Sequence, residues 1–172
     1  MAITPDTKNW TWVLECPCPD CGFDPASAPF DRVPELLRAN VARWPAVLAR
    51  PDVAVRPNEQ TWSPLEYAAH VRDVFRVFRG RLDLMLAQDA PSFPNWDQDA
   101  TAVAEHYAEQ DPRTVATELT EAGLAAADAF EAVPVRDRER RGLRSDGSAF
   151  TVATLATYFL HDPVHHLNDV RG

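Results

Sequence analysis

The fold of this protein is decided most clearly by residues 62–86, WSPLEYAAHVRDVFRVFRGRLDLML. Ser63 is a typical helix N-cap, Pro64 suits the first helical position, and Glu66, three residues after the cap, completes a capping box. Beyond this start, apolar side chains recur every three or four residues, which is the spacing of one face of an amphipathic helix. The stretch therefore predicts a long helix with one apolar stripe, formed by Tyr67, Val71, Val74, Phe78, Leu82 and Met85.

Three other parts of the chain show the same helical spacing. The first covers residues 33–48, where Pro45 is expected to kink the helix or end it early. The next has two stretches, 101–109 and 112–130, which separate at an Asp-Pro pair that can cap a new helix. The last helix begins at residue 152, after a threonine cap.

Patterns typical of strands are few. The Arg-rich segment 136–148 contains two glycines and is interpreted as a loop or a short hairpin. Helices of these lengths and connections predict an all-α protein, an up-down-up-down four-helix bundle. A chain of 172 residues is long enough for one domain with a complete core. We expect the bundle to cover residues 31–172, after an irregular Cys-containing extension over residues 1–30.

The chain is strongly acidic. It has 17 basic and 26 acidic residues, which gives a formal net charge of −9. This balance argues against nucleic acid or an anionic membrane as the main partner. No apolar run approaches the roughly 18 residues needed to span a bilayer, and the first ten residues lack the features of a secretory signal. We therefore expect a cytoplasmic protein that binds neither nucleic acid nor membrane.

Histidines gather near the end of the chain, and helical geometry separates them into two sets. At about 100° per residue, His166 falls on the apolar arc of the last helix, and Asp162, one turn earlier, lies at the edge of that arc. His70 borders the apolar stripe of the 62–86 helix. A carboxylate and two imidazoles that meet between helices are a ligand set for a divalent metal, with an open position for water or substrate. We predict such a site at these three residues.

The other two histidines of the cluster, His161 and His165, lie four residues apart on the opposite face of the helix. All three cysteines lie in the segment 16–21, CPCPDC, and an odd, clustered set does not look like a disulfide framework. Cys18 and Cys21, placed over the histidine pair, would complete a tetrahedral Cys₂His₂ sphere that suits a closed structural zinc site. This is a second metal hypothesis, and it gives the first cysteine no role.

Because of Pro163, the sequence does not decide which residues are the inner ligands. A proline inside a helix removes one hydrogen bond and can kink the helix, or Asp162 can cap a fresh helix that begins at the proline. In either case the helical angles change, and His161 could replace Asp162 as the inner ligand. Asp162 could also act only as a cap, and His70 could be an ordinary buried histidine with hydrogen-bond partners.

Several other polar side chains have two interpretations. Glu66 and Asp73 flank His70 and either orient its imidazole or face water. The loop around Trp96 and the Arg-rich segment could line the mouth of the site, where arginines would receive an anionic substrate. Alternatively, these arginines form a solvated loop with their acidic neighbours: Arg136, Arg138, Arg140, Arg141 and Arg144.

Two motifs resemble the DinB/YfiT-like superfamily: WxxxExxxHxxD at residues 62–73 and HHxxDV at residues 165–170. The resemblance covers most of the chain after residue 30. It implies a four-helix bundle with a divalent metal held by three inward residues, here His70, Asp162 and His166.

Asp162 departs from the common family pattern, which has a histidine at this position. The sequence is similar in this respect to the mycothiol-dependent maleylpyruvate isomerase branch, in which a carboxylate takes that place. The N-terminal cysteine segment lies outside the common pattern and looks like an extension found in one bacterial subgroup.

The resemblance implies a small-thiol-dependent transferase or isomerase that acts on a small-molecule substrate. Its cofactor would be Zn²⁺, Ni²⁺ or another divalent ion, and its co-substrate mycothiol or another small thiol. Two alternatives are a metal-dependent hydrolase and a non-catalytic, metal-stabilised binding or stress-response protein. Because members of the family often form dimers, a homodimer is also expected.

Overall fold

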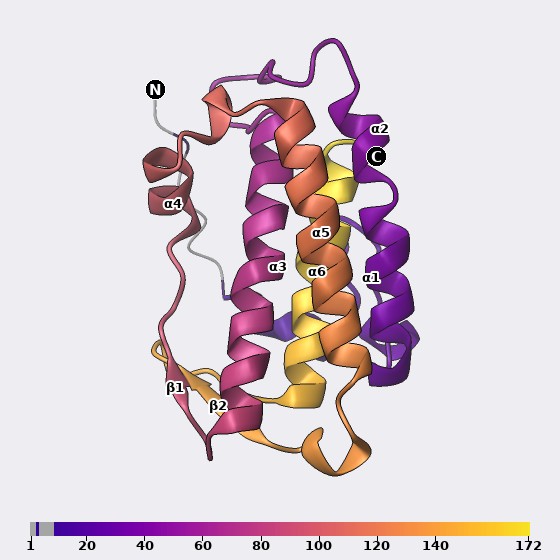
Figure 1. The fold of residues 1–172 in the computed structure, drawn as a ribbon, viewed down its shortest axis with the longest axis vertical. Coiled ribbons are helices and arrows are strands. Elements are labelled where there is room, and N and C mark those ends of the chain that lie inside the picture. The colour runs from indigo at the N-terminus through magenta and orange to yellow at the C-terminus, as the bar shows by residue number, and fades with distance from the viewer. Residues whose placement is uncertain (1–2, 4–8) are drawn as a thin grey trace.

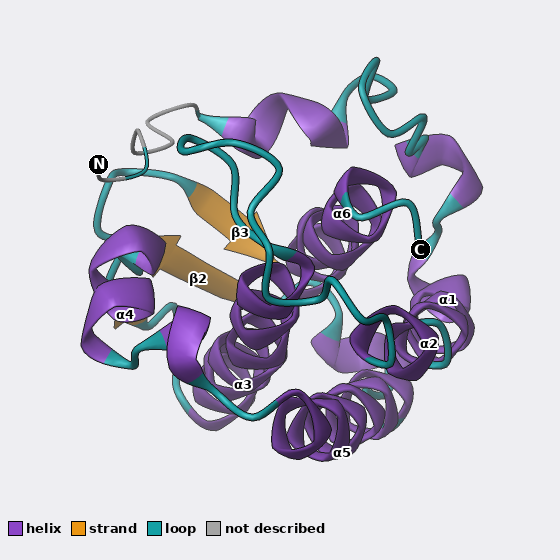
Figure 2. Cartoon of the chain, turned by 90° about the horizontal axis from the view of Figure 1, so that it is seen from above, coloured by secondary structure: helices purple, strands orange, loops and turns teal. Residues whose placement is uncertain are grey.

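The computed structural model describes residue 3 and residues 9–172 of the chain. Four helical rods surround a common apolar core, so the predicted four-helix bundle is confirmed (Figures 1 and 2). The first rod is broken in two, and the chain between the second and third rods carries an additional short helix. The helices are α1 (Val33–Val41), α2 (Trp44–Leu48), α3 (Pro64–Ala87), α4 (Gln98–Ala104), α5 (Pro112–Glu131) and α6 (Val152–Asp169).

The rods do not alternate in direction, although an up-down-up-down order was predicted. Arg72 near the start of α3 binds Glu118 near the start of α5, so these two neighbours run parallel. The side chain of Asn40 in α1 donates to the carbonyl of Pro163 in α6. Further along the chain from both residues, Arg50 donates to the carbonyl of Val170, so the first and last rods also run in the same direction. The physical reason is the long connection after α3, which carries the chain back along the bundle before α5 begins (Figure 1).

The local start and stop signals are mostly confirmed. Ser63 and Glu66 form the predicted capping box of α3. Asp111 caps α5, since it accepts a hydrogen bond from the amide of Thr114 at 2.8 Å. The first rod ends early, which was one of the two expectations at Pro45: α1 ends at Val41, and Pro45 lies in the first turn of α2. A first-turn proline costs no helical hydrogen bond, so the new helix starts just before it.

The stretch expected as a helix over residues 101–109 is a shorter helix followed by a turn. Asp97 caps α4, which therefore begins three residues early. The helix ends at Ala104, and His106 adopts a left-handed conformation with φ of 50°. A 3-10 turn over Tyr107–Glu109 then leads to α5.

A short hairpin, one of the two interpretations of the segment 136–148, is present, and it extends beyond that segment to Thr151. Strand β2 (Arg141–Arg144) pairs antiparallel with β3 (Ala149–Thr151), and β1 (Ser92–Phe93) adds in parallel to β2. The order is therefore β1-β2-β3. Gly142 permits close packing, because a Cβ there would lie 2.7 Å from the Phe93 ring. The sheet thus holds the chain just before Trp96 against the bundle.

Helix α6 is continuous through Pro163, so Asp162 is not the cap of a fresh helix. Thr151 forms a capping box with Thr154 at the true start of the helix. The side-chain amide of Asn40 donates to the Pro163 carbonyl at 2.8 Å, which ties α6 to α1 at the proline. The regular helical spacing of residues 161–166 is therefore preserved.

Of the expected extension over residues 1–30, residues 1–2 and 4–8 lie outside the described residues. The N-terminal segment of residues 9–30 lies along the outer side of α6 (Figure 2). Its 3-10 helix Trp10–Leu14 packs on α6, and Val13, Cys18 and Phe23 are buried. No helix in the described part of the chain is both long enough and apolar enough to cross a membrane.

Candidate metal centres

The first cluster lies between α3 and α6 and joins the three residues predicted as inner ligands. His70 is fully buried, and its Nε2 atom lies 3.3 Å from Oδ1 of Asp162. Nε2 of His166 lies 3.8 Å from the same oxygen. The three ligand atoms are all within 4.8 Å of one another. Asp162 therefore faces His70, whereas His161 turns to the other side of α6 and is not part of this cluster.

Aromatic rings fix the orientation of both imidazoles. The His70 ring stacks on Trp96 with 5.4 Å between centroids and 6° between planes. Trp62 lies on another side of His70, also at 5.4 Å. Tyr67, one turn before His70 on α3, packs against the His166 ring at 5.0 Å. The rings can therefore turn little, and the nitrogen atoms that face Asp162 are held in place.

Asp169 orients His166, a role absent from the predictions made from sequence. Its Oδ2 atom lies 2.9 Å from Nδ1 of His166, so this nitrogen donates its proton to the carboxylate. Nε2 then carries the lone pair that faces Asp162. Histidine ligands of metals commonly have such a carboxylate on their outer nitrogen. The spacing of three residues in the HHxxDV motif is the signal that could have identified it.

Glu66 and Asp73 do not orient His70. Glu66 accepts hydrogen bonds from Arg56 and Ser63 at the start of α3. Burial would raise the pKa of Glu66, but these bonds lower it overall. Asp73 binds Arg72 and the Tyr107 hydroxyl, and its pKa is likewise lowered although burial opposes the shift. Glu66 therefore serves in the predicted capping box and in an ion pair with Arg56, and Asp73 joins α3 to the turn at Tyr107. Neither carboxylate orients His70.

The donor atoms of the inner cluster fit a cation. Nε2 and Nδ1 of His70 and Oδ1 of Asp162 are buried and have no hydrogen-bond partner among the described residues. Burial would raise the pKa of Asp162, but the adjacent His70 and His166 lower it to about 2, so the carboxylate is ionised at neutral pH. Two imidazoles and one carboxylate are a donor set that zinc and related divalent ions accept.

The second cluster joins the N-terminal segment to the opposite face of α6. Ligand atoms of Cys18, Cys21, His161 and His165 all lie within 4.8 Å of one another. Sγ of Cys18 is 3.7 Å from Nδ1 of His165. The structure thus brings the two predicted half-sites together. Cys16 is exposed and lies outside the cluster.

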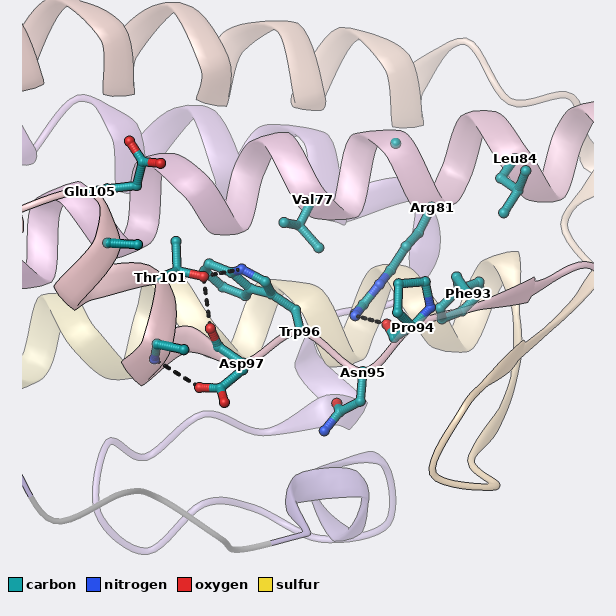
Figure 3. Close-up of a pocket in the computed structure, with 13 residues that line it drawn as sticks. Val77, Arg81, Leu84, Phe93, Pro94, Asn95, Trp96, Asp97, Thr101 and Glu105 are labelled. Carbon is teal, nitrogen blue, oxygen red and sulfur yellow. Dashed lines mark hydrogen bonds between the residues drawn. The ribbon is translucent and has the colours of Figure 1, made fainter.

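A pocket of about 590 Å³ lies between α3 and the connection that runs from β1 to α4 (Figure 3). Trp96 lines it as well as stacking on His70, so this ring separates the pocket from the inner cluster. The cation of the pocket is Arg81, which was not singled out from sequence. It packs on the rings of Phe78 and Phe93 and donates to the Pro94 carbonyl. Burial and nearby Arg144 lower the pKa of Arg81 to about 10.

The arginines of the 136–144 segment do not line this pocket. Arg138 pairs with Asp31, and Arg140 donates to the carbonyls of Met85 and Gln88. Arg144 binds Asp146 within the hairpin and donates to the Tyr158 hydroxyl of α6. These contacts order the hairpin and hold it to the rest of the fold. The arginine that lines the pocket is Arg81.

No family model and no curated protein matches this sequence. Among solved structures the fold is similar to YfiT from Bacillus subtilis, described as a probable metal-dependent hydrolase with an unusual four-helix bundle topology. The TM-score is 0.67, the sequences are 17% identical, and the match covers 81% of each chain. The resemblance inferred from the two sequence motifs is thereby confirmed at the level of the fold.

Proposed function

We propose that this protein is a divalent-metal enzyme that activates a small thiol, with His70, Asp162 and His166 as ligands of a Zn²⁺ ion. One observation carries the proposal. Three ligand atoms converge inside the bundle. Those of His70 and Asp162 are buried and face each other at 3.3 Å, but neither makes a hydrogen bond of good geometry to any described residue. A buried polar atom left unsatisfied costs about 1–3 kcal/mol, and a shared cation would satisfy both.

The chain's own residues shape access to this centre. When bound, such an ion lowers the pKa of a coordinated thiol or water and keeps the nucleophile ionised at neutral pH. Trp62 and Trp96 cover His70 and exclude water from that side. The side chains of Asp162 and His166 remain 28% and 18% exposed. A thiol would therefore approach from the side of these two ligands.

The pocket beside Trp96 suggests the class of small molecule that reacts with the thiol. Its lining is mostly apolar, and the buried guanidinium of Arg81 is packed against rings. The guanidinium of Arg81 donates to the Pro94 carbonyl, and among the described residues it forms no direct ion pair with a carboxylate. Two carboxylates, Asp97 and Glu105, also line the pocket, so its charge does not select an acidic group. The pocket therefore suits a small substrate with an apolar body. Trp96, shared by pocket and centre, would set the distance between them.

A metal-dependent hydrolase is the second candidate. The similarity in fold to YfiT, described as a probable metal-dependent hydrolase, favours it. The carboxylate at position 162, which is similar to the thiol-dependent isomerase branch, favours the first. In a hydrolase, water rather than a thiol would be the nucleophile, and the same three ligands would serve.

Turnover assays with and without a thiol separate the two candidates. The full chain, loaded with Zn²⁺, would be given maleylpyruvate, reactive electrophiles and activated esters, each with and without mycothiol. We expect turnover that requires the thiol and that falls to background in His70→Ala. Ester hydrolysis unaffected by thiol would contradict the thiol proposal in favour of the hydrolase. No turnover with any substrate would favour a non-catalytic protein.

Asp169→Asn is expected to weaken the inner centre without unfolding the bundle. The amide cannot hold the proton of His166 Nδ1 as strongly as the carboxylate, and loss of such a partner typically lowers metal affinity about 10–100-fold. Chelator competition against the zinc-loaded protein measures this change. The matched control is Asp83→Asn, an exposed carboxylate on α3 that should leave zinc affinity unaltered. Equal affinities in the two variants would show that Asp169 does not position the ligand.

A further inference from the structure

We propose that Cys18, Cys21, His161 and His165 bind a second zinc ion in a closed, structural site that fastens the N-terminal segment to α6. The four side chains come from two segments about 140 residues apart in sequence. No other pair of described segments supplies two cysteines and two histidines to one point. This site is independent of the inner centre and of the reaction proposed there.

The distances suit tetrahedral coordination. Zinc bonds of about 2.3 Å to sulfur and about 2.0–2.1 Å to nitrogen place neighbouring ligand atoms roughly 3.3–3.8 Å apart in a tetrahedron. Sγ of Cys18 and Nδ1 of His165 are 3.7 Å apart, within this range. The remaining pairs lie within 4.8 Å, so small rotations of the side chains would complete the sphere.

The cysteine segment has the backbone of a tight turn. The amide of Gly22 donates to the Cys18 carbonyl at 2.8 Å, and the amide of Cys18 donates to the Phe23 carbonyl at 2.8 Å. Gly22 has φ of +73°, a conformation that favours glycine. The turn reverses the chain directly after Cys21, and both sulfur atoms lie on the side that faces α6.

A second, independent observation comes from His161. Its side chain is 5% exposed, yet its Nε2 atom has no hydrogen-bond partner among the described residues. A buried imidazole with an unpartnered nitrogen beside two thiols has the form of a zinc ligand.

A disulfide between the two cysteines explains less of the structure. It would leave the buried nitrogen of His161 unpartnered and would use neither imidazole. A bound zinc ion would use both sulfur atoms, as thiolates, together with both imidazoles.

The site is closed to substrate. Trp10 packs against the rings of His161 and His165 at 5.3 Å and 5.2 Å, and Phe23 meets His161 edge-on at 5.4 Å. Four protein ligands under an aromatic cover leave no open position, as in structural zinc sites. Asp169 lies 3.8 Å from Nε2 of His165, on the side of the ring away from Cys18.

The second zinc site lies on the same turns of α6 as the inner centre and would affect the geometry of that centre. His161 precedes Asp162, and His165 precedes His166, so each ligand of one centre is the chain neighbour of a ligand of the other. Pro163 removes a helical hydrogen bond from this same turn. Zinc held by His161 and His165 would fix the turn despite the proline, and with it the direction of Asp162 and His166.

Zinc analysis of the full-length protein tests the proposal. We expect two zinc ions per chain in the wild type, loss of one in the double variant Cys18→Ser/Cys21→Ser, and no loss in the control Cys16→Ser. Replacement of zinc by Co²⁺ should give a thiolate-to-metal charge-transfer band that the double variant lacks. The same band should persist in His70→Ala, so failure of the inner centre is distinguishable from failure of this site.

A measurement on the wild type guards against a double variant that does not fold. Titration of the folded protein with an organic mercurial, which blocks thiols, should release one zinc ion as Cys18 and Cys21 react. Zinc content that is unchanged by the double substitution or by thiol blockage would overturn the proposal. So would a Co²⁺-loaded protein without the charge-transfer band.

Discussion

His166→Ala is expected to lose the inner metal ion while the bundle stays folded. His166 supplies one of three ligands, so its removal leaves a two-ligand site, and the loss of affinity should exceed the 10–100-fold that is typical when only an orienting partner is removed. The side chain lies at the edge of the bundle and is 18% exposed, so truncation leaves no large cavity. Zinc content after dialysis and the far-ultraviolet circular dichroism spectrum measure the two effects.

A surface histidine provides the matched control. His106 is exposed and adopts a left-handed backbone conformation, which asparagine tolerates, so His106→Asn should retain all bound zinc. The Co²⁺–thiolate band should survive in His166→Ala, because the second cluster has its own four ligands. Full zinc occupancy in His166→Ala would refute the assignment of this residue as a ligand.

Phe159→Ala is expected to destabilise the protein by about 3–5 kcal/mol, the usual cost of truncating a fully buried phenylalanine. Phe159 lies at the centre of the bundle, one turn before Asp162. Its ring meets those of Phe75, Phe78 and Phe130 at centroid distances of 5.9, 4.9 and 5.4 Å. Because these rings come from α3 and α5, the truncation leaves a cavity shared by three helices. Urea unfolding followed by circular dichroism measures the change in the free energy of unfolding.

Leu124→Ala on α5 is the control for this experiment. Leu124 is 41% exposed, so its truncation should cost well under the loss at Phe159. If the two substitutions lowered the free energy of unfolding equally, the core would not be centred on the aromatic cluster as the structure describes.

The sequence was sufficient for the bundle because the main signals are local. The capping box at Ser63 and the Asp111 cap each act within one turn, and periodicity identifies the apolar face of each long helix. The direction of each rod, in contrast, is not determined by local signals. It depends on how far residues 88–111 travel along the bundle, and no pattern in that connection encodes its path.

Pro163 is the reason that the sequence alone could not decide between His161 and Asp162 as the inner ligand. A kink, a fresh helix and a continuous helix are all compatible with His-Asp-Pro. The continuous helix is accompanied by the hydrogen bond from Asn40, a contact from another rod 123 residues earlier in the chain. Strand β1 was missed for a similar reason, because two residues form a strand only when β2 lies beside them.

Helical spacing alone identified which residues of the candidate centres lie together. Residues four apart share a face, so Asp162 and His166 face α3 while His161 and His165 face the cysteine turn. The supporting residues could not be obtained in this way. Glu66 and Asp73 have partners such as Arg56 and Tyr107, which come from outside α3.

The most direct test of the central claim is anomalous diffraction at the zinc edge from crystals of the full, zinc-loaded chain. We expect an anomalous peak between α3 and α6, about 2.0–2.2 Å from His70 Nε2, an Asp162 carboxylate oxygen and His166 Nε2. A structure in which these three side chains bind only one another, with no peak between them, would contradict the claim.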